Sequence, residues 1–406
     1  QPGASTMTFS AFCARCRKKV KKAERIIRYF DMFAGVGGFR AGLDLAGGFR
    51  CIGHCEIDKY ADASYRAIHA PGKEEVYYPD ARTIDPKELP DFDLLCGGFP
   101  CQAFSTAGRR KGFEDARGTL FFELARVVKE KRPLYLFLEN VVGLLSHDRG
   151  RTFGVILSAL YDLGYHVEWT VLNSKHFGVP QSRRRLFLIG YLDPRCAGKI
   201  LPVFGADAKA LVQIVHGRLG KRVYDSAGIA CTQDTSRQSG LYFVDLTKGD
   251  PKITANARCL HTRQDGSLTN FKGQNSGVLY IKEATKKGYK EAHEGDSIDL
   301  GFAGSNTRRG RVFAGVAHTV DTANTHGIVL RGGRVRRLMP RECFRLQGFD
   351  EDQIDKILAI NSDAQAYKQA GNGVTVTVIE AIGRRIRAAD AELHDKEEGR
   401  DVCPTM

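Results

Sequence analysis

Between residues 25 and 190 the chain alternates short apolar stretches of strand type with amphipathic stretches of helix type. The stretches predict strands at 26–32, 50–55, 93–96, 134–138, 166–172 and 185–191, and helices at 39–46, 59–69, 120–131 and 151–163. Strands that alternate with helices form a mostly parallel sheet with helices on both faces. We therefore predict an α/β, doubly wound fold, in which a ligand lies at the carboxyl ends of the strands.

The amino-acid composition changes after residue 193. Residues 200–335 are rich in Gly, Thr, Ser, Asn and basic residues, which predicts a smaller, loop-rich, β-containing domain. Helical patterns return at 340–346 and 374–389, and that segment is expected to rejoin the larger domain. The predicted division is a basic extension at 1–24, a larger domain at 25–192, a smaller domain at 193–335, a returning segment at 336–390 and a charged tail at 391–406.

The net charge of +14 favours a polyanionic partner. The cations gather in short clusters, several of them beside glycine: RCRKKVKKAER at 15–25, GRRKG at 108–112, QSRRRLF at 181–187, TRRGRV at 307–312 and RGGRVRRL at 331–338. We find no apolar run of the roughly 18 residues that a membrane helix needs, and the opening QPGASTM lacks the apolar core of a secretory signal. We expect a cytoplasmic protein, in which structural disulfides are rare.

Two closely spaced pairs of cysteines are candidates for function. Cys13 and Cys16 form a CxxC, but no second Cys/His pair follows at zinc-finger spacing, so we predict no metal site and an exposed basic segment instead. In LLCGGFPCQAFS, Cys96 lies in an apolar strand and is expected to pack, whereas Cys101 lies on the loop that follows. A reactive thiolate needs nearby positive charge and some exposure. By chemistry alone, Cys101 could be a nucleophile or an inert loop cysteine.

The glycine loop FAGVGG at 33–38 follows the first predicted strand and opens a helix. Glu56 stands at the end of the next strand, where an acid can bind ribose hydroxyls. Phe33 in the turn argues against a pyrophosphate cradle, so a cofactor with ribose and adenine but no phosphates, such as S-adenosylmethionine, fits better. The alternative is a tight strand–helix turn without a ligand.

Charged residues follow two later strands. Glu139 interrupts an apolar run at a strand end, where partial burial can raise the pKa of a carboxyl group and let it carry a proton. A helix cap is the alternative for this residue. Strand alternation sends Arg183 and Arg185 to one face and Arg184 to the other. Two arginines on one face suit substrate binding, whereas a solvated strand edge would explain one.

The ordered motifs of this chain resemble those of the C5-cytosine DNA methyltransferases, most closely the bacterial enzymes of restriction–modification type. The resemblance covers about residues 28–191 and 335–383, and the middle stretch matches only in texture, as expected for a target-recognition domain. It rests on FAGVGG at 33–38, Glu56-Ile57-Asp58, GGFPCQAFS at 97–105, GFEDARGTL at 112–120, LENV at 138–141, QSRRRLF at 181–187, RLMPRECFRLQGF at 337–349 and YKQAGNGV at 367–374.

The resemblance implies a Rossmann-like, S-adenosylmethionine-dependent enzyme that methylates C5 of a flipped-out cytosine in a specific duplex DNA sequence. Cys101 matches the nucleophile that adds to C6. Glu139 matches the carboxyl group that holds N3 and the exocyclic amine of the base and supplies a proton. Arg183 and Arg185 match the arginines that contact the base or its flanking phosphates. The resemblance also implies double-stranded DNA as partner, with a monomeric protein and neither metal nor membrane.

Cofactor and DNA contacts carry over by position. Asn372 and Val374 are expected near the methionine end of the cofactor, with Gly373 between them where many relatives have Ser or Ala. The other cofactor residues implied are Phe33, Ala34, Gly35, Val36, Gly38, Glu56, Ile57, Asp80, Pro100 and Leu120. The DNA-binding residues expected are Gln102 and Ser105 near the extruded nucleotide, Arg109, Arg110 and Lys111 in the loop at 105–115, and Arg308, Arg309 and Arg311 in the smaller domain.

Two other functions compete with this prediction. A methyltransferase of the same chemistry could act on tRNA, but the long middle domain and the sequence PCQAFS argue against it. A DNA-binding regulator that has lost catalysis is disfavoured because Cys101, Glu139 and both arginines are present. The recognition sequence, and the side chains that read it, do not follow from the sequence.

Overall fold

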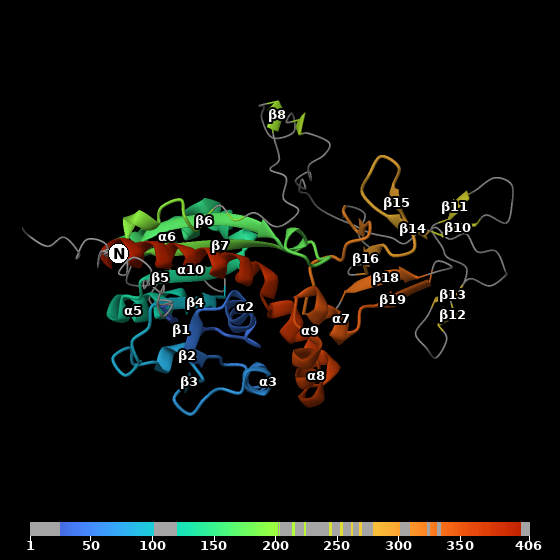
Figure 1. The fold of residues 1–406 in the computed structure, drawn as a ribbon. Coiled ribbons are helices and arrows are strands. Elements are labelled where there is room, and N and C mark those ends of the chain that lie inside the picture. The colour runs from blue at the N-terminus through green and yellow to red at the C-terminus, as the bar shows by residue number, and fades with distance from the viewer. Residues whose placement is uncertain are drawn as a thin grey trace, which may run out of the picture.

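The computed structural model describes residues 25–100, 120–201, 279–300, 309–322, 325–330 and 334–398, with residue 203 and six short strands between 213 and 269. A seven-stranded sheet forms the larger domain (Figure 1), in the order β3-β2-β1-β4-β5-β7-β6. β7 runs in the opposite direction to the other six strands of this sheet, so the predicted doubly wound, mostly parallel sheet is confirmed. The strands are β1 Ile27–Met32, β2 Phe49–Cys55, β3 Val76–Tyr78, β4 Leu94–Gly98, β5 Tyr135–Val141, β6 His166–Asn173 and β7 Arg184–Tyr191.

Both faces of the sheet are apolar and covered by helices. In β1, Ile27 and Tyr29 point to one buried cluster, and Phe30 and Met32 to another. Helices α2 (Gly38–Ala46) and α10 (Val376–Glu398) cover the first face, and α5 (Leu120–Lys131) and α6 (Arg151–Asp162) cover the second. Each fully buried Leu, Ile or Phe side chain contributes about 1.5–3 kcal/mol, so these two layers hold the larger domain together.

Helix α10 lies directly on α2 because α2 presents Gly42 to it. A Cβ built on Gly42 would lie 2.6 Å from Cβ of Ile379, so no larger residue fits without a shift. The contact joins residues that are more than 300 positions apart and returns the C-terminal segment to the sheet, as predicted. The predicted start of the tail at 391 falls inside α10, where Leu393 is buried in the core. Core packing also continues past residue 192, as far as Val203.

Helices α7 (Pro340–Leu346), α8 (Glu351–Ile360) and α9 (Asp363–Asn372) pack with α3 (Lys59–His69) around a third apolar cluster. The sequence patterns did not predict α8, α9 or the short strand β3. A local signal for α8 was present, because Asp350 and Gln353 form a capping box at its start. The short 3₁₀ helices are Ala81–Thr83, Val142–Leu145, His147–Gly150, Ser174–His176 and Pro194–Cys196.

The smaller domain consists of antiparallel strands with their own core. β14 (Leu279–Lys282) pairs with β15 (Tyr289–Ala292), and a four-stranded sheet follows in the order β17-β16-β18-β19. Ile281, Ile298, Val312 and Val329 pack between them, which confirms the predicted β-containing domain. The sheet strands are β16 Ser297–Asp299, β17 Val312–Phe313, β18 His326–Leu330 and β19 Arg334–Arg337; the isolated pairs are β8 Gln213–Val215 with β9 Val223–Tyr224, β10 Phe243–Asp245 with β11 Lys252–Thr254, and β12 His261–Thr262 with β13 Leu268–Thr269.

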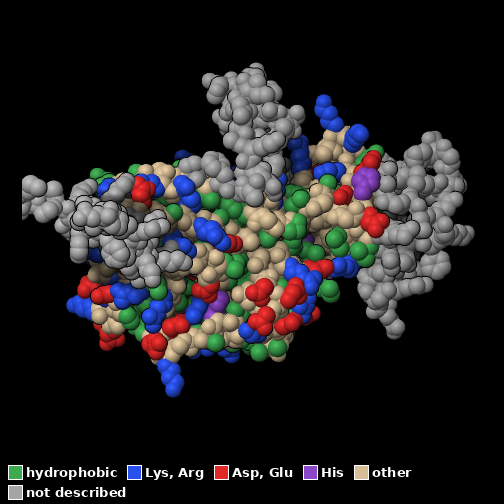
Figure 2. Space-filling view, viewed as in Figure 1, with side chains coloured by type: hydrophobic (Ala, Val, Ile, Leu, Met, Phe, Trp, Pro, Cys, Tyr) green, Lys and Arg blue, Asp and Glu red, His purple; other side chains and the backbone are tan. Residues whose placement is uncertain are grey.

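Within the described ranges, no helix combines the length and the apolar character needed to cross a bilayer. On the face seen in Figure 2, acidic and basic side chains are interspersed over the larger domain. The net positive charge therefore does not form a continuous cationic stripe on the described part of that face.

Candidate active site

Glu139 and two arginines lie together at the ends of β5 and β7. Val141 pairs with Arg185 and Glu139 with Phe187, so Glu139 and Arg185 are diagonal neighbours on one face of the sheet. Nε of Arg185 lies 3.0 Å from Oε1 of Glu139. Arg183 is buried on the same side, whereas Arg184 is exposed, as strand alternation predicts. The structure thus brings together three of the four predicted catalytic side chains.

Burial governs the electrostatics of this group. It raises the pKa of Glu139, although Arg185 and Arg183 act in the opposite direction. Burial also lowers the pKa of Arg185, and it lowers that of Arg183 to about 9, with the charge of Arg185 as a second cause. Guanidinium groups stay protonated in proteins, so Arg185 places a positive charge directly against the carboxyl group of Glu139, and the charge of Arg183 acts on the same carboxyl group. Such a site attracts an anionic group such as a phosphate or a thiolate.

The residue after Glu139 fixes the neighbouring loop. The Asn140 side chain is buried, and its Nδ2 donates to the carbonyl of Phe99 at 2.8 Å. Its Oδ1 accepts from the N–H of Val141 at 2.8 Å. Glu139 is no helix cap, because the 3₁₀ helix that follows begins after Val141. Asn140 therefore holds the end of β4 against β5, and Glu139 is left to face Arg185.

The two cysteines of LLCGGFPCQAFS have different surroundings. Cys96 is fully buried in β4, with Sγ 3.7 Å from both Oδ1 of Asp31 and the carbonyl of Phe30. Burial raises the pKa of its thiol well above the ordinary value, so Cys96 packs, as predicted. Cys101 lies outside the described residues, and its role as nucleophile stays a prediction. The same holds for Gln102, Ser105, Arg109, Arg110, Lys111 and Arg308.

The loop at 33–38 has the backbone of a ligand cradle. Phe33 and Gly35 both have positive φ angles, 60° and 57°, and for Phe33 this is an uncommon conformation. The N–H of Gly35 donates to Oε2 of Glu56 at 2.7 Å, and the N–H of Asp58 donates to Oε1 at 2.8 Å. Glu56 thus fixes the loop, and each carboxylate oxygen keeps a lone pair for a further donor. Burial raises the pKa of Glu56, against these two backbone bonds.

Beside Glu56 the side chain of Ile57 is 69% exposed at the end of β2. An exposed apolar side chain next to a carboxylate suits a nucleoside, whose base needs an apolar face and whose ribose needs acceptors. Asp80 is also near the surface, where Arg82 pairs with its carboxylate at 2.6 Å and lowers its pKa. These residues fit S-adenosylmethionine, the cofactor expected from the sequence.

Four more predicted cofactor residues lie in the described part of the chain. Val374 packs on the loop, since a Cβ on Gly38 would lie 2.7 Å from Cγ2 of Val374. Asn372 is exposed at the end of α9. Pro100 and Leu120, both half-buried, border the segment at 101–119 that the structure does not describe. The fold therefore joins the first and the last of the predicted cofactor motifs.

The smaller domain holds two predicted DNA-binding arginines in different settings. Arg309 is exposed, and its Nε donates to the carbonyl of Ala284 at 2.6 Å. Arg311 is buried, and its Nη2 donates to the carbonyl of Asp299 at 2.7 Å. The side chain of Arg311 stabilises the smaller domain from within, and this placement does not support its predicted phosphate contact.

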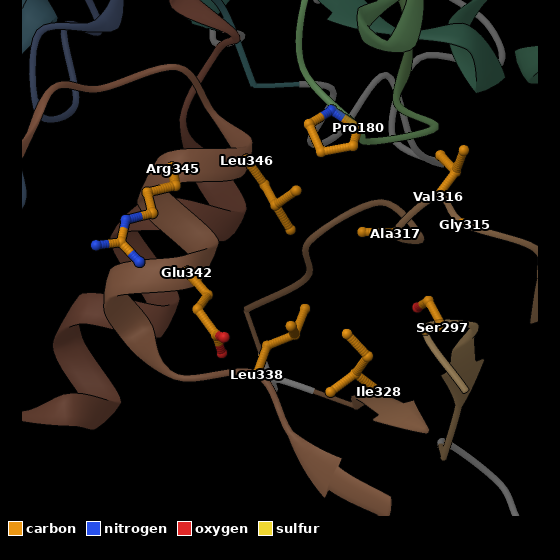
Figure 3. A pocket seen from close by; sticks show the side chains of 11 residues that line it. Pro180, Ser297, Gly315, Val316, Ala317, Ile328, Leu338, Glu342, Arg345 and Leu346 are labelled. Carbon is orange, nitrogen blue, oxygen red and sulfur yellow. The ribbon is translucent and has the colours of Figure 1, made fainter. Parts of the chain in front are cut away.

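A junction between the two domains was missed by the sequence reasoning. Gln181 is fully buried; its Nε2 donates to the carbonyl of Leu346 at 2.7 Å, and its Oε1 accepts from the N–H of Val320 at 3.0 Å. A cavity of about 320 Å³ lies beside it (Figure 3), between Pro180, α7 and the strands of the smaller domain. Gln181 precedes the arginines in QSRRR, and a polar residue at the start of a strand gave no sign of burial.

Among the described residues, no group of three or more His, Cys, Asp or Glu side chains is arranged to hold a metal ion.

Comparisons with known proteins agree with this geometry. The family model described as C-5 cytosine-specific DNA methylase matches residues 27–388. The orphan methyltransferase M.SPRI of Bacillus phage SPR is 32% identical over 436 residues, with 89% of this chain and 97% of that protein covered. The type II methyltransferase M.HpaII of Haemophilus parainfluenzae is 34% identical over 372 residues, covering 90% and 91%. The solved structure of S. pombe Dnmt2 methyltransferase, 16% identical, has the same fold with a TM-score of 0.50 over 90% of this chain and 99% of that one.

Proposed function

Because the chain belongs to the C-5 cytosine-specific DNA methylase family, and is a DNA cytosine C5 methyltransferase, we propose that it methylates a flipped-out cytosine in a specific duplex sequence through a covalent Cys101–C6 intermediate. The observation that carries the proposal is the buried pair of Glu139 with Arg185, 3.0 Å apart, at the strand ends beside the cradle at 33–38. A carboxyl group with a raised pKa can donate a proton to a neutral base, and two cationic side chains suit the negative charge of the DNA phosphates.

The chemistry begins with activation of the base, because C5 of cytosine is a poor nucleophile. The Cys101 thiolate adds to C6, while Glu139 donates its proton to N3, so that C5 gains enamine character. The positive charge of Arg183 and Arg185 favours the thiolate over the thiol. S-adenosylmethionine, when bound, supplies an electrophilic methyl group. After C5 is methylated, a water molecule removes the C5 proton, the C6–S bond breaks and the thiolate leaves, and the N3 proton returns to Glu139, which restores the neutral base and the protonated carboxyl group.

The cofactor is held by the cradle at 33–38. When the cofactor is bound, Glu56 would accept hydrogen bonds from the ribose hydroxyls with its remaining lone pairs, and the exposed side chain of Ile57 would offer an apolar surface to the adenine. Phe33, Ala34, Val36, Gly38, Asp80, Pro100 and Leu120 line the same site, with Asn372 and Val374 at the methionine end. These assignments predict that S-adenosylmethionine and its product S-adenosylhomocysteine bind in the absence of DNA.

The DNA is bound across both domains. A stacked cytosine is out of reach of a buried carboxyl group, so the target base leaves the helix and enters the site beside the Glu139–Arg185 pair. Gln102 and Ser105 are assigned to contacts with the extruded nucleotide by their positions in the GGFPCQAFS motif. Arg109, Arg110, Lys111, Arg308 and Arg309 contact phosphates. The protein acts as a monomer in the bacterial cytoplasm, at the nucleoid.

A labelled-methyl transfer assay tests this function. The protein is incubated with labelled S-adenosylmethionine and either duplex DNA or tRNA, with Cys101→Ser as the control. We expect label in duplex DNA as 5-methylcytosine, and a loss of about 10³-fold or more for Cys101→Ser. Label in tRNA alone would identify an RNA methyltransferase. No transfer to either substrate by clean protein that binds DNA would identify an inactive regulator.

A further inference from the structure

The Arg183 side chain is bound to the main chain of two distant segments. Its Nη1 donates to the carbonyl of Val320 at 3.0 Å, and its Nη2 donates to the carbonyls of Gly371 and Gly373 at 2.9 and 2.7 Å. The whole residue is only 2% exposed. Of the guanidinium nitrogens, Nε alone has no partner among the described residues. The two terminal nitrogens of Arg183 are thus bound to main-chain carbonyls, whereas the guanidinium of Arg185 pairs with the side chain of Glu139.

The two segments that Arg183 joins also touch each other directly. A Cβ built on Gly371 would lie 2.6 Å from the carbonyl carbon of Asp321 and the nitrogen of Thr322. No side chain separates the turn at 371–373 from the segment at 320–322. Gln181, two residues before Arg183, binds Val320 from the other side. The segment between β17 and β18 of the smaller domain is therefore locked to the turn at the end of α9.

This turn is part of the cofactor site of the proposed function, on which the inference rests. Asn372 lies between Gly371 and Gly373, whose carbonyls Arg183 binds, and Val374 packs against Gly38 of the cradle. Two residues further along β7, Arg185 holds Glu139. Arg183 is therefore two residues from Arg185 in the base site, and it is hydrogen-bonded directly to the turn at 371–373 of the cofactor site.

We propose that Arg183 is a positioning residue for the cofactor, which holds the turn at 371–373 in place by tying it to the segment at 320–322 of the smaller domain. This assignment differs from the contact with the base or its phosphates that the sequence predicted. Two nitrogens in a planar fork are needed to reach three carbonyls, so lysine cannot replace arginine here. A residue that touched only the base would leave cofactor binding in the absence of DNA unchanged.

Titration calorimetry with S-adenosylhomocysteine, with and without duplex DNA, tests the proposal. Arg183→Lys should weaken binding in the absence of DNA by about 10-fold or more, since bonds from a charged donor to main-chain carbonyls are lost. In initial rates, KM for S-adenosylmethionine should rise by more than kcat falls. The matched control, Arg184→Gln, changes the exposed neighbour on the opposite face and should bind like the wild type.

Gly371→Ala tests the same junction without touching Arg183. Its Cβ pushes the turn away from Asp321, so the affinity for S-adenosylhomocysteine should again fall, whereas Gly154→Ala, with no atom within 4 Å of its new Cβ, should leave it unchanged. Normal S-adenosylhomocysteine affinity in folded Arg183→Lys, or in folded Gly371→Ala should Arg183→Lys fail to fold, would overturn the positioning role. A wild-type protein that binds no S-adenosylhomocysteine would instead overturn the proposed function itself.

Discussion

The cradle at 33–38 and the Glu139–Arg185 pair lie at the same edge of one sheet, but different features shape them. The cradle depends on glycine, because Gly38 has no side chain and so allows Val374 to approach. Its loop is also fixed by Glu56, which accepts hydrogen bonds from backbone N–H groups. Buried charges shape the second site, where Glu139 pairs with Arg185 and also feels the charge of Arg183. The first region should therefore respond to added volume, and the second to altered charge. The comparison would fail if added volume disturbed mainly the second region, or if altered charge disturbed mainly the first.

The largest effect is expected from Glu139→Gln, which keeps the shape of the side chain and removes its proton. Methyl transfer should fall by about 10²–10⁴-fold, the usual contribution of a general acid. S-adenosylhomocysteine affinity without DNA should not change, because Glu139 belongs to the second region alone. Single-turnover rates and calorimetry measure the two quantities. A variant with wild-type rates would show that Glu139 does not supply the proton.

Gly97→Ala is expected to act on folding. A Cβ at this position would lie 2.0 Å from the carbonyl oxygen of Met32, at the end of β1 where the cradle begins. The strands must move apart, so the free energy of unfolding should fall by about 3 kcal/mol. Urea unfolding followed by circular dichroism measures this change, with Gly154→Ala as the control. An unchanged midpoint would contradict the backbone contact between β1 and β4.

The next glycine along the chain faces the other region. A Cβ on Gly98 would lie 3.1 Å from Oε2 of Glu139, so Gly98→Ala moves a flexible carboxylate rather than a backbone. We expect stability within about 1 kcal/mol of the wild type, and a kcat about 10-fold lower from the displaced carboxyl group. Should Gly98→Ala unfold the protein as strongly as Gly97→Ala, the two regions would not differ in the way described.

The smallest expected effect is a shift of the pH profile in Arg185→Gln. The reaction needs protonated Glu139, so the rate falls as pH rises through the pKa of Glu139, which burial already holds above its ordinary value. Arg185 favours the carboxylate and lowers this pKa, so its removal raises the pKa further and moves the falling limb to higher pH. Single-turnover rates against pH measure the limb. A shift to lower pH would contradict the assigned proton donor.

Local patterns predicted the elements that hold both regions. The alternation of Ile27, Tyr29, Phe30 and Met32 specifies a strand that is buried on both faces, and the arginines of QSRRR follow the same rule. The ends of these strands must lie at one edge, so sequence order alone places the cradle near Glu139.

Long-range contacts of backbone groups had no such signal. The carbonyls that Arg183 binds belong to residues 320, 371 and 373, and carbonyls are the same in every sequence. The burial of Arg311 depends on how the smaller domain closes around Asp299. A basic cluster read from sequence gives the charge of TRRGRV but not which of its arginines faces solvent.

The central claim is that Cys101, and not its neighbour Cys96, attacks the base. Duplex DNA that contains 5-fluorocytosine at the methylated position traps the enzyme, because fluorine at C5 cannot leave as a proton does. Mass spectrometry of the digested complex in the presence of S-adenosylmethionine should find the adduct on the peptide that carries Cys101. An adduct on Cys96, which is buried and has a raised pKa, or no adduct despite methylation of ordinary DNA, would contradict the account.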